Sequence, residues 1–137
     1  MVEAEYLIDT NIFLEVLLDQ ENRGNRVKFL RMVESGKIRA VMTSFSLHSI
    51  AIILERLKGI EHYQDFLEVF VNFEGLMVYS TTPQDEIEIC KISRKKKLSF
   101  DDVLHYFIAK TFGLKIVSFD SGFDKTEITR VAPKDII

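Results

Sequence analysis

Carboxylates stand at three points of the sequence where an apolar segment meets a polar one. Asp9 ends one short apolar run, Asp120 ends another, and the pair Asp101-Asp102 opens the apolar-periodic segment before the second run. If the two runs are parallel strands, their ends and the start of the crossing helix share one edge of the sheet. Clustered carboxylates repel one another unless a cation joins them, and Mg²⁺ or Mn²⁺ prefers such oxygen ligands. The pattern therefore predicts a divalent-metal site that can activate water against a phosphodiester.

Most of these acids also have a purely structural interpretation. Asp102 follows Ser99 at the spacing of a capping box, which begins a helix. Asp101 falls in the same first turn, where the helix dipole favours a negative charge. Asp120 and Asp124 flank Ser-Gly in an evident turn. Only the joint placement of these acids with the one after the first apolar run indicates a site.

The elements that must position these acids follow from the apolar pattern. Strands are expected at residues 4–8, 40–43, 76–79, 115–119 and 128–132. Helices are expected at residues 11–19, 27–33, 44–57, 63–73, 83–97 and 99–112. Strands separated by helices predict an α/β fold with a largely parallel sheet and right-handed crossovers. The segment at 4–8 is apolar throughout, so it should be a central strand covered on both faces.

Three details of these helices can be tested directly. The first has Thr10 or Asn11 as its expected N-cap. The third should begin at Ser44 or Ser46 and, being apolar nearly all round, should pack deeply. Residues 63–73 carry aromatic side chains at helical spacing, which we interpret as core or as a subunit interface.

Composition narrows the class of protein. The chain has 137 residues, of which 47% are hydrophobic, so residues 1–137 are expected to form a single domain with a substantial core. The lone Cys90 excludes an intramolecular disulfide framework and suits a reducing compartment. The longest apolar run, 50–54, is too short to span a bilayer, and the N-terminus lacks the pattern of a secretion signal. We therefore expect a cytoplasmic protein without membrane contact.

The net charge of −3 gives no global basic footprint for nucleic acid. Binding to RNA would need local patches or metal ions. The cluster Arg94, Lys95, Lys96 and Lys97 precedes the acidic pair and is one candidate, and Arg23 with Arg26 is the second. The first cluster is most simply a solvated helix end, because cations suit a helix C-terminus, and a structural role is the simpler interpretation of both patches.

Three motifs carry a resemblance to a known family. They are Leu7-Ile8-Asp9-Thr10-Asn11, then Leu98-Ser99-Phe100-Asp101-Asp102, then Ile116-Val117-Ser118-Phe119-Asp120 with Phe123 after it. In order and spacing they resemble the motifs of PIN domains, and in length the chain is most similar to VapC-type toxins of toxin–antitoxin modules. The resemblance implies a three-layer α/β/α fold with a parallel five-stranded sheet of order 3-2-1-4-5.

The resemblance also implies an activity and a ligand set. The family is known for Mg²⁺- or Mn²⁺-dependent ribonucleases. Asp9, Asp102 and Asp120 match its first, third and fourth acids, and Asn11 the polar residue that orients the first. Ser118 matches a position that is usually Thr or Ser, and Asp124 lies where some members carry a further acid. A small antitoxin partner and homodimerisation are likewise implied.

The sequence departs from the family at its second acid. That residue is usually a Glu near the start of the third helix, where this chain has His48-Ser49-Ile50. Glu55 lies about 8–9 Å further along such a helix at about 1.5 Å per residue. His48 or Ser49 could supply a neutral ligand, and Asp101 or Asp124 could compensate. Losing one anionic ligand should weaken binding of a hard cation.

Three hypotheses follow. The leading one is a Mg²⁺- or Mn²⁺-dependent endoribonuclease in which Asp9, Asp102 and Asp120 hold the metal and RNA is the substrate. The second is a catalytically weakened or inactive PIN-like domain kept for RNA binding or protein assembly. A phosphate monoesterase ranks third. Such enzymes often carry Asp-x-Asp after the first strand, and Asp9-Thr10-Asn11 lacks the second Asp. An aromatic stripe at 63–73 further predicts self-association.

Overall fold

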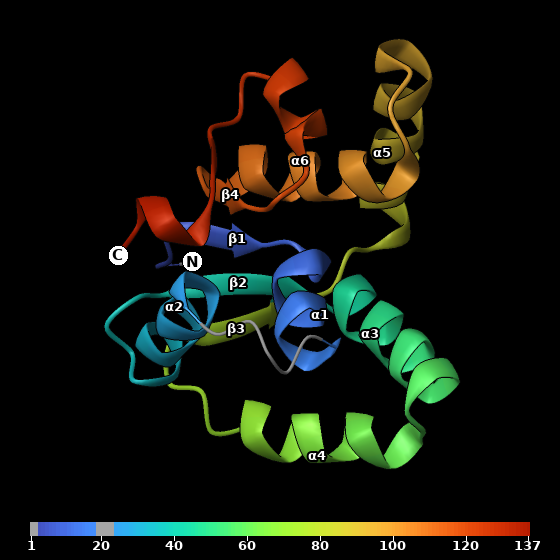
Figure 1. The fold of residues 1–137 in the computed structure, drawn as a ribbon. Helices are drawn as coiled ribbons and strands as arrows, with labels where there is room; N and C mark the ends of the chain where they lie inside the picture. Colours follow the sequence, from blue (N-terminus) through green and yellow to red (C-terminus); the bar gives the residue numbers. More distant parts are fainter. Residues whose placement is uncertain (1–2, 19–23) are drawn as a thin grey trace.

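A parallel sheet with helices on both faces organises the chain in a computed structural model, which describes residues 3–18 and 24–137 (Figure 1). The candidate Arg23 lies outside the described residues. The sheet is five-stranded and all parallel, in the order β3-β2-β1-β4-β5, as predicted. Its strands are β1 (Tyr6–Ile8), β2 (Ala40–Thr43), β3 (Leu76–Tyr79), β4 (Lys115–Val117) and β5 (Arg130–Val131).

Helices cover both faces of this sheet. One layer contains α1 (Thr10–Leu18), α2 (Asn25–Glu34), α3 (Ser44–Leu57) and α4 (Ile60–Phe70). The other contains α5 (Pro83–Lys96), α6 (Phe100–Phe112) and the 3₁₀ turn η1 (Ser121–Lys125), while a second turn, η2 (Pro133–Asp135), packs against α2. Figure 1 shows the two helical layers on opposite sides of the strands. None of the helices in the described ranges is long and apolar enough to cross a membrane.

The central strand is buried on both sides because its side chains alternate between two cores. Ile8 joins the core under α1 to α4, and Leu7 joins the core under α5 and α6. β1 pairs with β2 on one side and with β4 on the other. The strand is apolar along its whole length because it is central, since a polar residue there would face a dry core.

Local sequence signals account for several helix ends. Thr82 and Asp85 form a reciprocal capping box at the start of α5, and Pro83 occupies the first turn. Gly113 ends α6 in the left-handed conformation that a residue without Cβ adopts readily. α3 begins at Ser44, the earlier of the two expected starts, and its cap is Thr43, whose hydroxyl accepts from the Ser46 amide.

Two packing expectations change in the structure. The third helix is not deeply packed all round, because Ile52 and Leu57 are exposed on its outer side. The aromatic stripe on the next helix belongs largely to the core: Phe70 is buried, and Tyr63 and Phe66 pack against the first core cluster. The outer side of this helix carries no aromatic side chain. Of the two interpretations of the aromatic stripe, core and subunit interface, the structure therefore supports core.

Candidate active site

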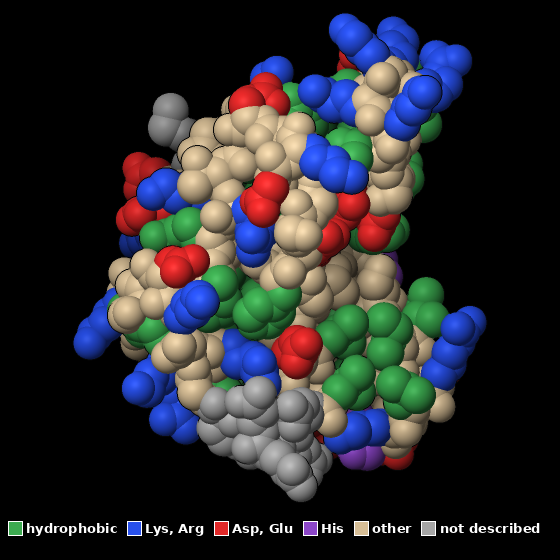
Figure 2. Space-filling model, turned by 45° about the horizontal axis from the view of Figure 1, so that its top comes forward, with side chains coloured by type: hydrophobic (Ala, Val, Ile, Leu, Met, Phe, Trp, Pro, Cys, Tyr) green, Lys and Arg blue, Asp and Glu red, His purple; other side chains and the backbone are tan. Residues whose placement is uncertain are grey.

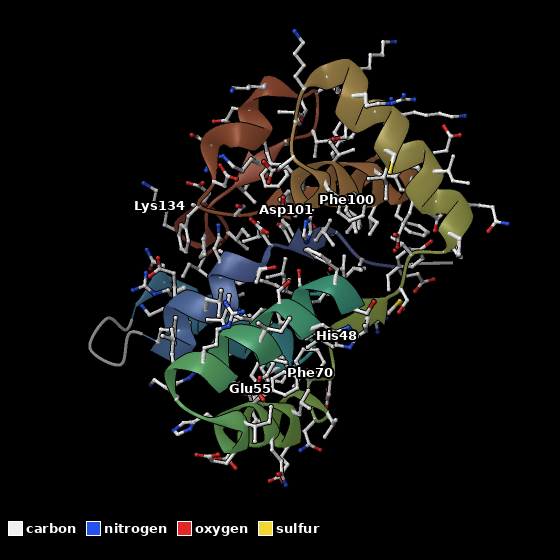
Figure 3. The ribbon with its side chains drawn as sticks, turned by 90° about the vertical axis from the view of Figure 1, so that its right-hand side faces the viewer. His48, Glu55, Phe70, Phe100, Asp101 and Lys134 are labelled. Atoms are coloured by element: carbon white, nitrogen blue, oxygen red, sulfur yellow. The ribbon has the colours of Figure 1, made fainter. Side chains whose placement is uncertain are left out.

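The acids meet at the edge of the sheet where the parallel strands end. Asp9 directly follows β1 and precedes α1, Asp120 follows β4 by two residues, and Asp102 lies in the first turn of α6. Figure 3 looks towards this edge and shows Asp101 at the start of α6. The predicted convergence of these segments is therefore present. Their proximity is a consequence of strand order, because β1 and β4 are neighbours.

Asp9 is held by three neighbours. Its Oδ1 accepts from the Thr10 amide at 2.8 Å, and its Oδ2 accepts from the Ser118 hydroxyl at 2.6 Å. The Asn11 amide nitrogen donates to Ser118 Oγ at 3.3 Å, and Asn11 Oδ1 accepts from the Phe119 amide at 3.4 Å. Asn11 thus orients Asp9 through Ser118 rather than by direct contact, and the chain end of β4 is tied to the start of α1.

Asp120 and Asp102 lie together beside Gly122. A Cβ on this glycine would stand 3.0 Å from Asp120 Oδ1 and 3.6 Å from Asp102 Oδ2. The Gly122 amide donates to Asp120 Oδ1 at 2.8 Å, and the Asp120 amide donates to Ser118 Oγ at 2.9 Å. The same serine hydroxyl therefore connects the segment carrying Asp120 with the carboxylate of Asp9.

The electrostatics of the cluster fall most heavily on Asp102. Burial raises the pKa of this carboxyl, and the negative charges of Asp120, Asp101 and Asp9 raise it further. A hydrogen bond from Ser99 lowers the pKa and only partly offsets these effects. Ser99 therefore serves Asp102 directly, and it makes no side-chain cap bond to the helix backbone. An acid that is costly to ionise among other acids is one that a cation would stabilise.

The donor set suits a hard divalent cation, since it consists of carboxylate oxygens. Within the described ranges, however, no three or more acidic, histidine or cysteine side chains are drawn together closely enough to form a metal-holding group. The oxygens of Asp9 and Asp120 instead accept hydrogen bonds from the chain itself. The residues fit the chemistry of such an ion, and the carboxylates are arranged around a shared edge.

A buried hydrogen-bond network lies behind Asp9. His105 is 2% exposed, and its Nδ1 lies 2.8 Å from the Asp101 carbonyl oxygen, to which only a protonated nitrogen can donate. Its Nε2 lies 3.1 Å from Ser46 Oγ and 4.0 Å from Asp9 Oδ1. Ser46 Oγ also accepts from the Thr10 hydroxyl at 2.7 Å and the Thr43 hydroxyl at 3.1 Å. In the neutral ring, Ser46 donates to Nε2 and every hydroxyl has a partner.

This network identifies the part of α3 that reaches the site. It is Ser46, which is fully buried, and neither of the two residues singled out from the sequence. His48 is exposed, and the Ser49 hydroxyl donates back to the Phe45 carbonyl at 2.9 Å. Figure 3 shows Glu55 towards the far end of α3, and it is exposed.

Sequence reasoning missed Ser46 and His105 as members of the site. A signal was present for each. Ser46 lies four residues before the buried Ile50, on the same face of the helix, and His105 lies three residues after Asp102. His105 is a hydrogen-bonded core residue, whereas the His48 side chain is exposed on α3.

Asp124 is engaged elsewhere. Its Oδ1 accepts from Arg130 Nε at 2.9 Å and its Oδ2 from Nη2 at 3.0 Å, and Arg130 Nη1 donates to the Ser118 carbonyl at 3.2 Å. This bidentate pair lowers the pKa of Asp124. Both oxygens that would ligate a metal are therefore committed to the guanidinium, which leaves Asp101 as the remaining candidate for a compensating acid.

The two basic candidates differ in their surroundings. All four residues from Arg94 to Lys97 are exposed, and Figure 2 shows Lys and Arg gathered over the end of α5. Within this cluster Lys96 Nζ lies 5.4 Å from the Tyr106 ring centroid. Arg26 stands on α2, where its Nη1 lies 3.8 Å from Glu15 Oε2. The cluster on α5 is thus the more accessible of the two.

Comparisons with known proteins identify a family by its profile and a shared fold by solved structures. The PIN-domain profile matches residues 6–128. Among solved structures, VapC20 from Mycobacterium tuberculosis, described as a toxin that cleaves the sarcin–ricin loop, has a TM-score of 0.72 at 15% identity, covering 93% of this chain and 98% of its own. DNA-bound VapBC from Salmonella typhimurium has a TM-score of 0.72 at 17% identity, covering 95% of this chain and 98% of its own. VapBC2 from Rickettsia felis, bound to a promoter DNA fragment, has a TM-score of 0.71 at 16% identity, covering 93% of this chain and 97% of its own. No curated protein matches the sequence.

Proposed function

We infer that this chain, which belongs to the PIN-domain family, is a divalent-metal-dependent endoribonuclease whose active site is the carboxylate cluster at the ends of β1 and β4. The observation that carries this proposal is the position of Asp102. Its pKa is raised by burial and by the three other acids, so the cluster carries a charge that it does not neutralise within itself. Such perturbed groups at a strand edge are typical of functional sites.

Asp9, Asp102 and Asp120 would hold the ion, with Asp101 next to them in the first turn of α6. When bound, Mg²⁺ or Mn²⁺ lowers the pKa of water and offsets negative charge on a phosphodiester. The chain itself supplies rigidity. Ser118 and Thr10 fix both oxygens of Asp9, and Gly122 fixes one oxygen of Asp120. Fixed carboxylates need little reorganisation when the ligand arrives.

The test compares metal-replete wild-type protein with Asp9→Asn on a broad panel of single-stranded and structured RNA. We expect cleavage by the wild type that EDTA abolishes and that Mg²⁺ or Mn²⁺ restores, and no cleavage by the variant. Wild-type protein that leaves the whole panel uncut, as the variant does, would refute the proposal. Calorimetric titration with Mn²⁺ gives an independent measure, since heat of binding should vanish in Asp9→Asn.

A second function is favoured by the hydrogen-bond network behind Asp9. On the helix where the family usually carries its second acid, this chain has Ser46, whose Oγ lies 3.1 Å from His105 Nε2, and that nitrogen lies 4.0 Å from Asp9 Oδ1. Neither side chain supplies a carboxylate. Such a site would bind metal weakly, and the domain would serve as an RNA-binding or assembly module. RNA binding that is unchanged by EDTA, together with no heat of Mn²⁺ binding, would favour this second function over the first.

We propose a small antitoxin as the protein partner. The similar solved structures include VapBC toxin–antitoxin complexes. On this chain, α1, α2 and α4 enclose an apolar groove of about 360 Å³, with Phe13, Leu17 and Phe66 in its walls. An amphipathic segment would bury apolar side chains there. Co-expression with the product of an adjoining gene should yield a stable complex, and Leu17→Lys should prevent it.

Self-association is a separate proposal. Exposed apolar side chains stand on α3, on α4 and directly after α4, and they are Ile52, Leu57, Ile60, Val69 and Val71. Val69 also lines the apolar groove. Exposed apolar surface is common at subunit interfaces. Light scattering at micromolar concentration should give the mass of a dimer, and a monomeric mass would refute this proposal.

A further inference from the structure

We propose that the pocket between the start of α2 and the turn η2 binds one nucleotide of single-stranded RNA, with its base against Phe119. This inference rests on the proposed function and names a substrate subsite for it. The pocket has a volume of about 590 Å³, and Arg26, Phe119, Arg130 and Lys134 are among its walls. That volume lies within the range of about 300–1,000 Å³ that is typical of small-molecule sites.

Phe119 couples the pocket to the acids. It is 40% exposed, although it stands in the chain between Ser118, which bonds Asp9, and Asp120. The Ser118 and Asp120 side chains make hydrogen bonds at the acidic edge, whereas the ring of Phe119 lines the neighbouring pocket. The Asn11 side chain accepts from its backbone amide at 3.4 Å and holds the segment in place. A base stacked on this ring therefore belongs to a strand that also passes the acids.

The walls of the pocket place cations beside an aromatic ring. They contain three cations, Arg26, Arg130 and Lys134, and one carboxylate, Asp135. Arg26 faces Glu15 at 3.8 Å and Arg130 pairs with Asp124, so carboxylates outside the walls offset two of these charges. A polyanion approaching an acidic protein is thus met here by cations that stand next to an aromatic ring.

Arg130 is held ready for a planar or anionic ligand. Three of its N–H groups are fixed by the two Asp124 oxygens and the Ser118 carbonyl, and the side chain retains 23% exposure. A guanidinium fixed in this way loses little conformational entropy when a phosphate or base arrives. Lys134 is exposed on η2 and supplies a mobile charge at the rim. Proteins that bind single-stranded nucleic acid use this combination of an aromatic face and a cation.

Binding of AMP and UMP to metal-free protein tests this inference, with inorganic phosphate and an acidic peptide as comparison ligands. We expect saturable binding of both nucleotides that Phe119→Leu weakens about five-fold or more, because an aromatic stack contributes on that order per base. Phe119→Tyr should retain binding, and Lys134→Gln should weaken it. The control is Phe45→Leu, since Phe45 is 37% exposed and lies outside the walls of the pocket.

Three results would overturn the inference. These are nucleotide binding that Phe119→Leu leaves unchanged, inorganic phosphate binding as tightly as AMP, and an acidic peptide displacing AMP with higher affinity. Thermal melting of each variant checks folding, and the exposed Lys134→Gln keeps the test decisive if Phe119→Leu is unstable. Failure of the proposed function gives a different result: nucleotides bind as expected and wild-type protein cuts no RNA. Conversely, RNA cut with the same KM by Phe119→Leu and wild type would refute the subsite alone.

Discussion

Asp102 and Asp124 both stand in the first turn of a helical segment, yet their pKa values move in opposite directions. Burial and three neighbouring carboxylates raise the pKa of Asp102, whereas a bidentate guanidinium lowers that of Asp124. The difference shows which of the two carboxylates has a counter-charge within the protein. Asp124 has its counter-charge in Arg130, and Asp102 lacks an equivalent partner among the groups that shift its pKa. We therefore propose Asp102 for the ligand site, whereas Asp124 is paired with Arg130.

The largest expected effect separates these two acids by activity. Asp102→Asn should reduce kcat for metal-dependent RNA cleavage by about 100-fold or more, since loss of a metal ligand should exceed the 10–100-fold typical of outer-shell partners. Asp124→Asn should retain kcat within a few-fold, because both of its oxygens bind Arg130. Steady-state kinetics on a cleavable RNA measures both. Equal losses in the two variants would show that the comparison is wrong.

The next effect concerns the buried hydrogen-bond network behind Asp9. Ser46→Ala should lower the free energy of unfolding by about 1–3 kcal/mol, since it leaves buried polar groups without a partner. The groups affected are His105 Nε2 and the hydroxyls of Thr10 and Thr43. Denaturant unfolding gives the value. Ser49→Ala is the matched control on the same helix, because its hydroxyl donates to the Phe45 carbonyl of that helix. A similar loss there would contradict the role assigned to Ser46.

Asp102 should also be a destabilising residue in the absence of metal. A raised pKa means that the folded protein binds the proton more tightly than the unfolded chain does, so stability falls as pH rises through the carboxyl range. Asp102→Asn removes this penalty and should raise Tm by a few degrees at neutral pH. The gain should vanish below the ordinary pKa of aspartate, where both side chains are neutral. Melting curves across pH in EDTA test this, and a lower Tm for the variant at pH 7 would contradict it.

The smallest effect is the mirror image at Asp124. Its lowered pKa contributes stability that is present above the ordinary carboxyl pKa and is lost as pH falls through the lowered one. Asp124→Asn should therefore lower Tm slightly at neutral pH and not at all in strong acid. The side chain is exposed, so salt should reduce the difference. Melting in low and high salt measures it, and a salt-independent change would point to packing instead.

The sequence predicts the fold closely because its signals are local and consistent. Apolar strands, Pro83 and the glycine after α6 place the elements, and the motif resemblance supplies the strand order that periodicity alone leaves open. The strand ends differ by a few residues, as at 115–119, where β4 ends at Val117 because Ser118 turns to serve Asp9. α3, which we expected to be buried all round, has exposed apolar side chains on its outer side, because apolar composition does not reveal which side of a helix lacks a neighbour.

By itself, the sequence determined that Asp9, Asp101, Asp102 and Asp120 reach one edge of a parallel sheet, because parallel strands must end on the same side. Only the tertiary structure decided which groups these acids meet. It placed His105 between Ser46 and Asp9, paired Asp124 with Arg130, and formed a pocket beside Phe119. The physical reason is that such contacts join residues far apart in the chain, and their geometry depends on packing angles and rotamers that residue spacing does not encode.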